Sequence, residues 1–167
     1  MNRSLTLALI TVGVLGTSQL SAQRSPFPLT EKLKALEGTW ARDATRGAGG
    51  ICGVNPADAV TIKVSASEIT LNPAATPGAT ATSGTVKLDG TETVLADGRT
   101  ATAALDAGWL AVTMRRERGG GANVMREVYI PLRGELTIWR TLNVELPDGS
   151  QGKIDCGNHH AIVYRQK

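Results

Sequence analysis

The feature that most constrains this chain is a two-residue hydrophobic period, interrupted by turn residues, which begins after Gly38, is clearest from residue 100 and continues almost to the C-terminus. Successive side chains of a β-strand point to opposite faces of the sheet, so this period indicates strands with one buried face. A helical period of three to four residues is absent from this part of the sequence. The pattern therefore predicts an all-β protein.

Turn residues divide the alternating region into hairpins. Residues 106–108 and 132–134 each end in glycine and join two alternating runs, and Asp89-Gly90 predicts another hairpin between the runs on either side of it. A loop with little order is expected over residues 72–84, which are rich in Pro, Ala, Thr and Gly. This rhythm predicts about eight strands in an antiparallel up-and-down meander, either closed as a barrel or folded as a sandwich.

Residues 1–22 have the form of a secretory signal peptide. Arg3 supplies the positive charge, an apolar run follows, and Ala22 is the small residue at the expected cleavage point. The run is shorter than the roughly 20 apolar residues that a membrane helix needs. We expect a periplasmic or secreted protein without stable membrane insertion, with an uncleaved N-terminal anchor as the alternative.

A short leader and a short helix precede the strands. Residues 23–29 are expected to be extended because they contain Pro26 and Pro28. Thr30 is the predicted N-cap of a two-turn helix that stops at Gly38. Residues 30–167 then form a single domain, since the length suits one core and not two.

The two cysteines of the chain, Cys52 and Cys156, predict a disulfide bond in an oxidising compartment. Closing a loop of about 100 residues would contribute roughly 4–5 kcal/mol on the chain-entropy model. The alternative is a metal site that adds His159 and His160 to the cysteines. Adjacent residues on a strand point to opposite faces, and oxidation removes thiolate ligands, so neither a metal nor another cofactor is expected.

The charge of the chain argues against a nucleic-acid partner. The formal net charge is only +3, and Arg3 is removed with the signal peptide. Nucleic-acid binding requires a concentrated basic face.

The two ends of the domain carry a family resemblance. Gly38-Thr39-Trp40, after a short helix, resembles the Gly-x-Trp opening of lipocalin-like (calycin) barrels, and residues 163–165 resemble their last strand. The resemblance implies that Trp40 plugs the closed end and that Arg165 packs over its ring, with a cation–π contact of roughly 0.5–2 kcal/mol. The Thr-Asp-Tyr-like turn of lipocalins and the Trp-rich biotin pocket of avidins are absent. The chain is thus most similar to the small exported lipocalin-like domains of bacteria.

Our first hypothesis for function is a barrel that binds a small apolar or amphipathic molecule in its interior or at its mouth. Eight-stranded barrels are just wide enough to be filled by side chains or to hold one small ligand. Strand alternation suggests the following ligand-binding side chains: Trp109, Met114, Met125, Tyr129 and Trp139.

Two alternatives remain open at this point. One is a filled barrel that contacts another envelope protein through its loops or an edge. The other is a small hydrolase or isomerase in which His159 or His160 is the base and Asp155 orients it. A nucleophile elbow of the Gly-x-Ser-x-Gly type is absent from the sequence, so an enzyme is the less favoured interpretation.

Arginines in the central strands raise a separate question. Arg126 and Arg140 each interrupt an alternating run. On the inner face they would hold a carboxylate or phosphate, whereas on the outer face they would solubilise the sheet with partners such as Glu127. The outer face is the favoured prediction, because unpaired charges are rarely buried.

Overall fold

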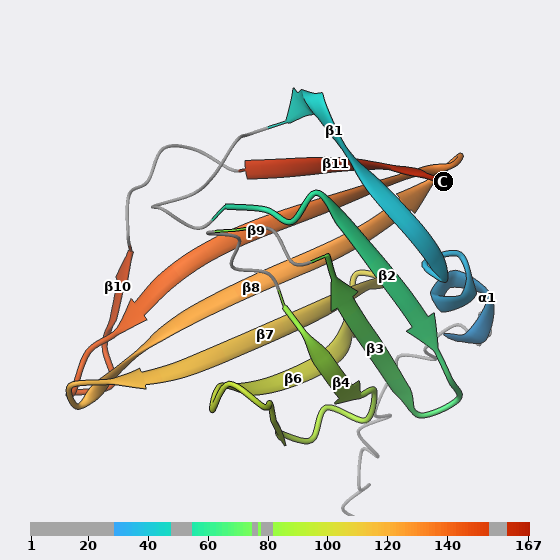
Figure 1. The fold of residues 1–167 in the computed structure, drawn as a ribbon. Helices are drawn as coiled ribbons and strands as arrows, with labels where there is room; N and C mark the ends of the chain where they lie inside the picture. Colours follow the sequence, from blue (N-terminus) through green and yellow to red (C-terminus); the bar gives the residue numbers. More distant parts are fainter. Residues whose placement is uncertain (1–28, 48–54, 75–76, 78–81, 154–159) are drawn as a thin grey trace, which may run out of the picture.

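The structure is a computed structural model that describes residues 29–47, 55–74, 77, 82–153 and 160–167. These residues form an antiparallel, nearly closed β-barrel with one short helix (Figure 1). The elements are α1 (Leu29–Lys34), β1 (Gly38–Gly47), β2 (Ala59–Val64), β3 (Glu68–Pro73), β4 (Gly84–Lys87), β5 (Thr93–Val94), β6 (Thr100–Asp106), β7 (Trp109–Arg118), β8 (Gly121–Leu132), β9 (Glu135–Glu145), β10 (Gln151–Lys153) and β11 (His160–Gln166).

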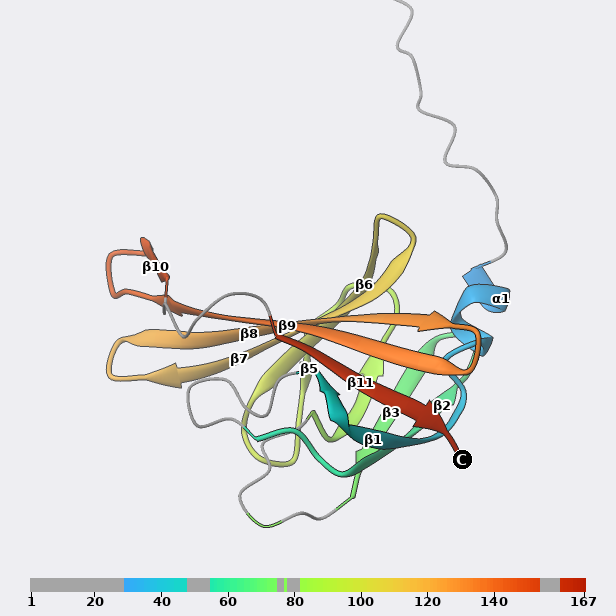
Figure 2. The ribbon, with the colours of Figure 1, turned by 90° about the horizontal axis from the view of Figure 1, so that it is seen from above.

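The strands follow the order β4-β3-β2-β1-β11-β9-β8-β7-β6-β5, and β10 pairs with β9 beside this path. The first and last strands are therefore neighbours, with Ala41 opposite Arg165. The ends of the path meet again because β4 lies next to β5 and β6. Figure 2 gives the view from above, in which β1 and β11 lie side by side. The prediction of an all-β antiparallel fold is confirmed, and of the two predicted closures the structure has the barrel.

Two details of the predicted topology are wrong. The described residues form eleven strands rather than about eight, because β5 is only two residues long and the chain after β9 turns into the short β10. The Asp89-Gly90 turn does not make a hairpin, since β4 pairs with β3 and β5 pairs with β6. The Asp89 carboxylate instead accepts hydrogen bonds from the Thr91 amide at 2.9 Å and the Thr91 hydroxyl at 2.7 Å. This local side-chain turn needs no strand pairing.

The other predicted turns are confirmed. Ala107 and Gly108 have φ angles of 48° and 84°, and Arg133 and Gly134 have 49° and 80°. Two consecutive residues with positive φ form the tight turn that matches the twist of a hairpin. At Gly108 a side chain would also meet the Lys32 ammonium group, because an added Cβ would lie 2.9 Å from Nζ.

Helix α1 covers one end of the barrel. It begins at Leu29, so Thr30 lies inside the helix and not at its N-cap as predicted. Leu33 and Leu36 are buried against Trp40, whose indole Nε1 donates a hydrogen bond of 2.8 Å to the Leu36 carbonyl. This end of the interior is therefore apolar and filled.

Several predicted features lie outside the described residues. They are the signal peptide of residues 1–22, the leader up to residue 28, both cysteines, Asp155 and His159. Within the described part, no helix is long and apolar enough to cross a membrane.

Candidate functional site

A charged pair lies on the inner face of the barrel. Glu127 on β8 is directly opposite Arg140 on β9 in the antiparallel ladder. Two apolar cross-strand pairs flank it on the same face: Met125 with Leu142 on one side, and Tyr129 with Ile138 on the other. Only 1% of Glu127 and 3% of Arg140 is exposed, so the ion pair is enclosed within an otherwise apolar surface.

The Glu127 carboxylate accepts hydrogen bonds on both oxygens. Arg140 donates to Oε1 from Nε at 2.7 Å, and its Nη2 lies 2.5 Å from the same oxygen. The Tyr129 hydroxyl donates to Oε2 at 2.6 Å, and the Thr82 hydroxyl donates to it at 2.7 Å. Two strands and the segment before β4 thus converge on one carboxylate, which is the satisfaction that a buried charge requires.

These contacts decide the protonation states of the cluster. Burial alone would raise the pKa of Glu127, but the Arg140 charge and the three hydrogen-bond donors outweigh it, and the pKa lies below its ordinary value of 4.5. Burial, and then the Glu127 charge, raise the pKa of Tyr129 well above 10.0. The cluster therefore holds a carboxylate, a guanidinium and a neutral phenol at neutral pH.

One donor of the cluster has no acceptor. The Arg140 Nη1 atom is buried and has no hydrogen-bond partner among the residues that the structure describes. An unpaired buried donor on a charged group costs about 1–3 kcal/mol or more, and native proteins seldom leave one unsatisfied. Nη1 is therefore the position at which an acceptor from outside the protein would complete the cluster.

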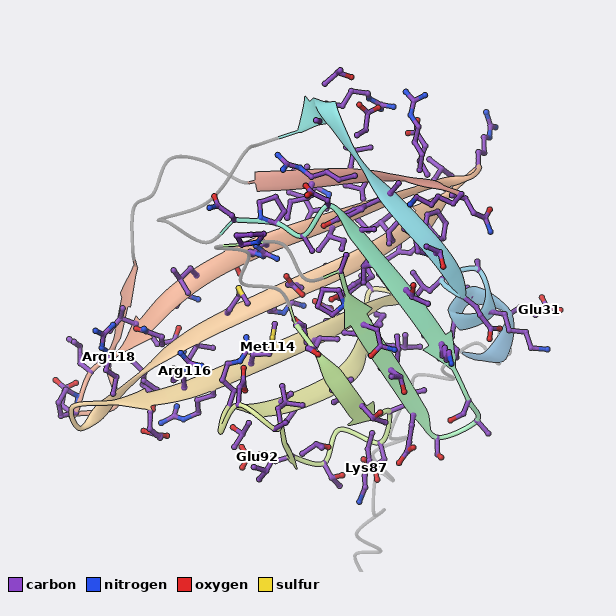
Figure 3. The ribbon with its side chains drawn as sticks, in the orientation of Figure 1. Glu31, Lys87, Glu92, Met114, Arg116 and Arg118 are labelled. Carbon is purple, nitrogen blue, oxygen red and sulfur yellow. The ribbon has the colours of Figure 1, made fainter. Side chains whose placement is uncertain are left out.

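Sulfur and hydroxyl groups surround the pair. The Met114 Sδ atom lies 3.7 Å from Nη1 of the buried Arg99 and 2.7 Å from the Thr82 hydroxyl. Met114 is also opposite Met125 in the β7–β8 ladder. Figure 3 shows Met114 in the middle of the barrel, whereas Arg116 and Arg118 lie toward the far tip of the β7–β8 hairpin. The burial of Thr82 corrects the expectation that residues 72–84 are a loop with little order throughout.

The structure divides the five predicted ligand-binding residues between two faces. Met114, Met125 and Tyr129 are buried on the inner face around the charged pair. Trp139 lies on the outer face and is 40% exposed. Trp109 is partly buried, and the Lys32 ammonium group of α1 lies 5.5 Å from its ring centroid, so its contact is with the helix.

The structure does not bring Trp40 and Arg165 together. Trp40 is 2% exposed and faces inward, whereas Arg165 is next to the buried Tyr164 on β11 and faces outward. The Arg165 side chain is 61% exposed and its Nη2 lies 2.9 Å from the Asp43 carboxylate. The alternation of a strand places neighbouring residues on opposite faces, so the end of the barrel is filled by Trp40 without a guanidinium over its ring.

The prediction that the arginines face outward holds for Arg126 and is wrong for Arg140. Arg126 pairs with Asp106 on the outer face, and Arg140 is buried. The interpretation of the sequence also placed Glu127 outside. A signal for both was present: Glu127 alternates with Met125 and Tyr129, so opposite charges occupy the apolar face of two consecutive strands.

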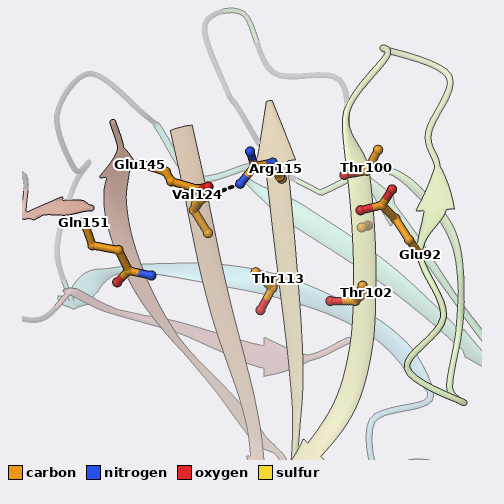
Figure 4. A pocket seen from close by; sticks show the side chains of 9 residues that line it. Glu92, Thr100, Thr102, Thr113, Arg115, Val124, Glu145 and Gln151 are labelled. Carbon is orange, nitrogen blue, oxygen red and sulfur yellow. Dashed lines mark hydrogen bonds and ion pairs between the residues drawn. The ribbon is translucent and has the colours of Figure 1, made fainter. Parts of the chain in front are cut away.

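A polar cleft of about 210 Å³ lies on the outer face, lined by Glu92 before β5 and by residues of β6, β7, β8, β9 and β10 (Figure 4). Its central cation is Arg115, which donates to Glu117 at 2.7 Å and also pairs with Glu145. These two carboxylates raise the pKa of Arg115, and Glu92 adds a further negative charge to the rim. The charge of the Arg115 guanidinium is thus already neutralised by the protein.

No protein-family model, no curated protein and no solved structure matches this chain.

Proposed function

We propose that this protein is an exported lipocalin-like barrel that binds one small amphipathic molecule in its interior, with the polar group of that molecule at Arg140. The observation that supports the proposal is the buried Nη1 donor without an acceptor, beside a carboxylate whose own hydrogen bonds are complete. An acceptor at Nη1 would remove the only deficiency of this buried cluster among the described residues.

The surroundings favour an amphipathic molecule over a purely apolar one. Met114, Met125 and Leu142 offer an apolar surface beside the pair, and methionine adapts readily to irregular shapes. A molecule without a polar atom would leave Nη1 unsatisfied and would gain only the apolar contact. An amphipathic molecule would contact the apolar side chains and also supply an acceptor to Nη1.

The proposal includes export and a disulfide. A signal peptide over residues 1–22, cleaved near Ala22, would deliver the chain to the periplasm or outside the cell, where Cys52 and Cys156 would be oxidised to one bond. The ligand would then be a molecule present in that compartment.

Mass spectrometry tests the proposal most directly. The protein is expressed with its own signal, purified from the envelope or medium without detergent, and weighed under native and denaturing conditions. The expected result is a denatured mass that lacks residues 1–22 and two thiol hydrogens, with an organic adduct in the native spectrum that disappears on denaturation. A bare native mass, together with no binding of any added amphipathic molecule, would contradict the binding function.

A second candidate is an interaction module, which the outer face supports. Trp139 is 40% exposed there, and the partly exposed Val128 is its partner across the β8–β9 ladder. A photo-crosslinking residue at position 139 should then capture a defined envelope protein in intact cells. The same residue at position 63, an exposed lysine on β2, is the control and should capture none.

A further inference from the structure

The charge balance around Arg140 indicates which kind of oxygen can occupy Nη1. We infer that the ligand presents an uncharged acceptor, the carbonyl oxygen of an amide, ester or ketone, and not a carboxylate or phosphate. This inference rests on the proposed function, because it concerns the polar group of the same ligand at the same site.

The first argument is that the Arg140 charge is already compensated. The Nε and Nη2 atoms on one edge of the guanidinium lie 2.7 Å and 2.5 Å from Glu127 Oε1, and both side chains are buried. The hydrogen bonds to Glu127 Oε2 from Thr82 and Tyr129 keep that carboxylate ionised. A ligand carboxylate at Nη1 would be a second negative charge in a site with one cation, and burying an uncompensated charge is unfavourable.

The second argument is that the other nearby arginines have carboxylate partners too. Arg99, which approaches Met114, holds Asp97 at 2.6 Å from its Nε. Arg116 from β7 adds a second cation to Asp97, with Nη2 at 3.8 Å, but its side chain is 55% exposed. On β1, Arg42 is 4.0 Å from Asp58. Among the described residues, the two buried arginines of this region, Arg99 and Arg140, thus each have a carboxylate partner, and the second cation on Asp97 belongs to the exposed Arg116.

The third argument is the hydrogen-bonding capacity that remains. A primary guanidinium nitrogen carries two N–H bonds and no acceptor. Nη1 therefore requires an acceptor and gains nothing from a ligand ammonium or from an alkyl chain alone. A carbonyl oxygen offers two lone pairs without adding charge, so it completes the hydrogen bonding and keeps the cluster neutral.

The experiment compares three probes with the same ten-carbon chain: decanamide, decanoate and decylammonium. Their dissociation constants for the purified, ligand-free protein are measured by isothermal titration calorimetry at pH 8, where the acid and the amine are charged. We expect decanamide to bind at least tenfold more tightly than either charged probe. Tightest binding of decanoate would overturn the inference and leave the binding function standing. No binding of any of the three would overturn the proposed function itself.

A spectroscopic readout places the contact at Arg140. In protein labelled with ¹⁵N-arginine, the resonances of a buried guanidinium are identified by their loss in the double variant Glu127→Leu/Arg140→Met, which removes both charges and leaves neither unpaired. Decanamide should shift the Arg140 resonances, and the exposed Arg126 on the outer face is the internal control that should not move. Binding of decanamide without a change at Arg140 would refute the assignment.

The double variant provides a further check by affinity. It keeps apolar side chains of similar size at both positions, so the barrel interior stays packed. The amide should lose its tenfold advantage over decylammonium in this variant. If the advantage persists, the amide is recognised elsewhere and the inference fails.

Discussion

Two regions of the barrel interior, both built on antiparallel strands, are filled by opposite chemistry. Next to α1, the indole of Trp40 packs with Leu33 and Leu36 and satisfies its only polar atom within the chain. On β8 and β9, Glu127 and Arg140 form a buried ion pair that leaves one donor unsatisfied. The Trp40 indole N–H thus has its acceptor within the protein, whereas Nη1 of Arg140 has none among the described residues.

On the proposed function, the residues that stabilise the fold and the residues that bind the ligand lie in different parts of the interior. Burial of a large aromatic side chain is a strong stabilising contribution. A buried ion pair contributes little net stability, because desolvation of two charges offsets most of their attraction. On the proposed function, this cost is offset by the directional donor that the pair would supply to a ligand.

The largest change in the free energy of unfolding is expected at Trp40. Trp40→Ala should lower the free energy of unfolding by roughly 3–5 kcal/mol, because a large cavity replaces the indole. The matched control is Trp139→Ala, which removes the same side chain from the exposed outer face and should cost about 1 kcal/mol or less. Chemical denaturation measures both, and equal losses would mean that Trp40 has no special place in the core.

At the Glu127–Arg140 pair, a single substitution and a double substitution should change the free energy of unfolding by different amounts. Glu127→Leu alone should cost about 3–5 kcal/mol, since it leaves the Arg140 guanidinium buried without a counter-charge. The double variant Glu127→Leu/Arg140→Met should recover most of this loss, and ligand affinity should not recover with it. A double variant as unstable as the single one would show that the ion pair is needed for the fold itself.

Alkaline pH should weaken the middle of the interior, where Tyr164 donates a hydrogen bond of 3.0 Å to the Ala57 carbonyl. Burial raises the pKa of this hydroxyl from 10.0 to about 12, so the folded protein keeps a proton that the unfolded chain releases. The resulting contribution, about 2–3 kcal/mol, is complete below pH 10 and is lost as the pH rises toward 12.

Denaturant titrations at pH 9, 10.5 and 11.5 measure this loss. The control is Tyr164→Phe, which has no hydroxyl at this position and should lose less stability over the same range. Parallel pH profiles for the two proteins would assign the alkaline sensitivity to other groups.

The smallest effect is expected on the outer face. Arg126 pairs with Asp106 and is exposed, so Arg126→Ala should change the free energy of unfolding by about 1 kcal/mol or less. It lies one residue before Glu127 on the same strand, which makes it the nearest control for the inner pair. A loss as large as that of Glu127→Leu would contradict the division of β8 into a solvated and a buried face.

Much of the fold was predictable because it depends on local sequence. The hairpin turns follow from Gly108 and Gly134, because glycine accepts positive φ, and the long strands follow from hydrophobic alternation. The false hairpin at Asp89-Gly90 shows the limit of this reasoning. The same two residues also suit a side-chain turn, and only the pairing of β4 with β3 and of β5 with β6 distinguishes the two.

The candidate site was predicted in part. Alternation grouped Met114, Met125 and Tyr129 on one face, and the structure buries them around the charged pair, while their contact with a ligand stays a prediction. Alternation could not show that Trp139 faces outward, because a strand pattern indicates which residues share a face and not which face is inside. Arg140 was assigned to the wrong face because burial of an unpaired charge is unfavourable, and the sequence does not show that Glu127 is its partner.

The sequence by itself determined the strand periodicity, most of the turns and the short helix, since each depends on neighbouring residues and their backbone preferences. Only the tertiary structure decided which face is the interior, which strands meet at the seam, and that Thr82, Tyr129 and Arg140 converge on Glu127. The physical reason is that a buried charge is stable only when every partner is in place, and these partners come from segments up to 58 residues apart that only the folded barrel brings together.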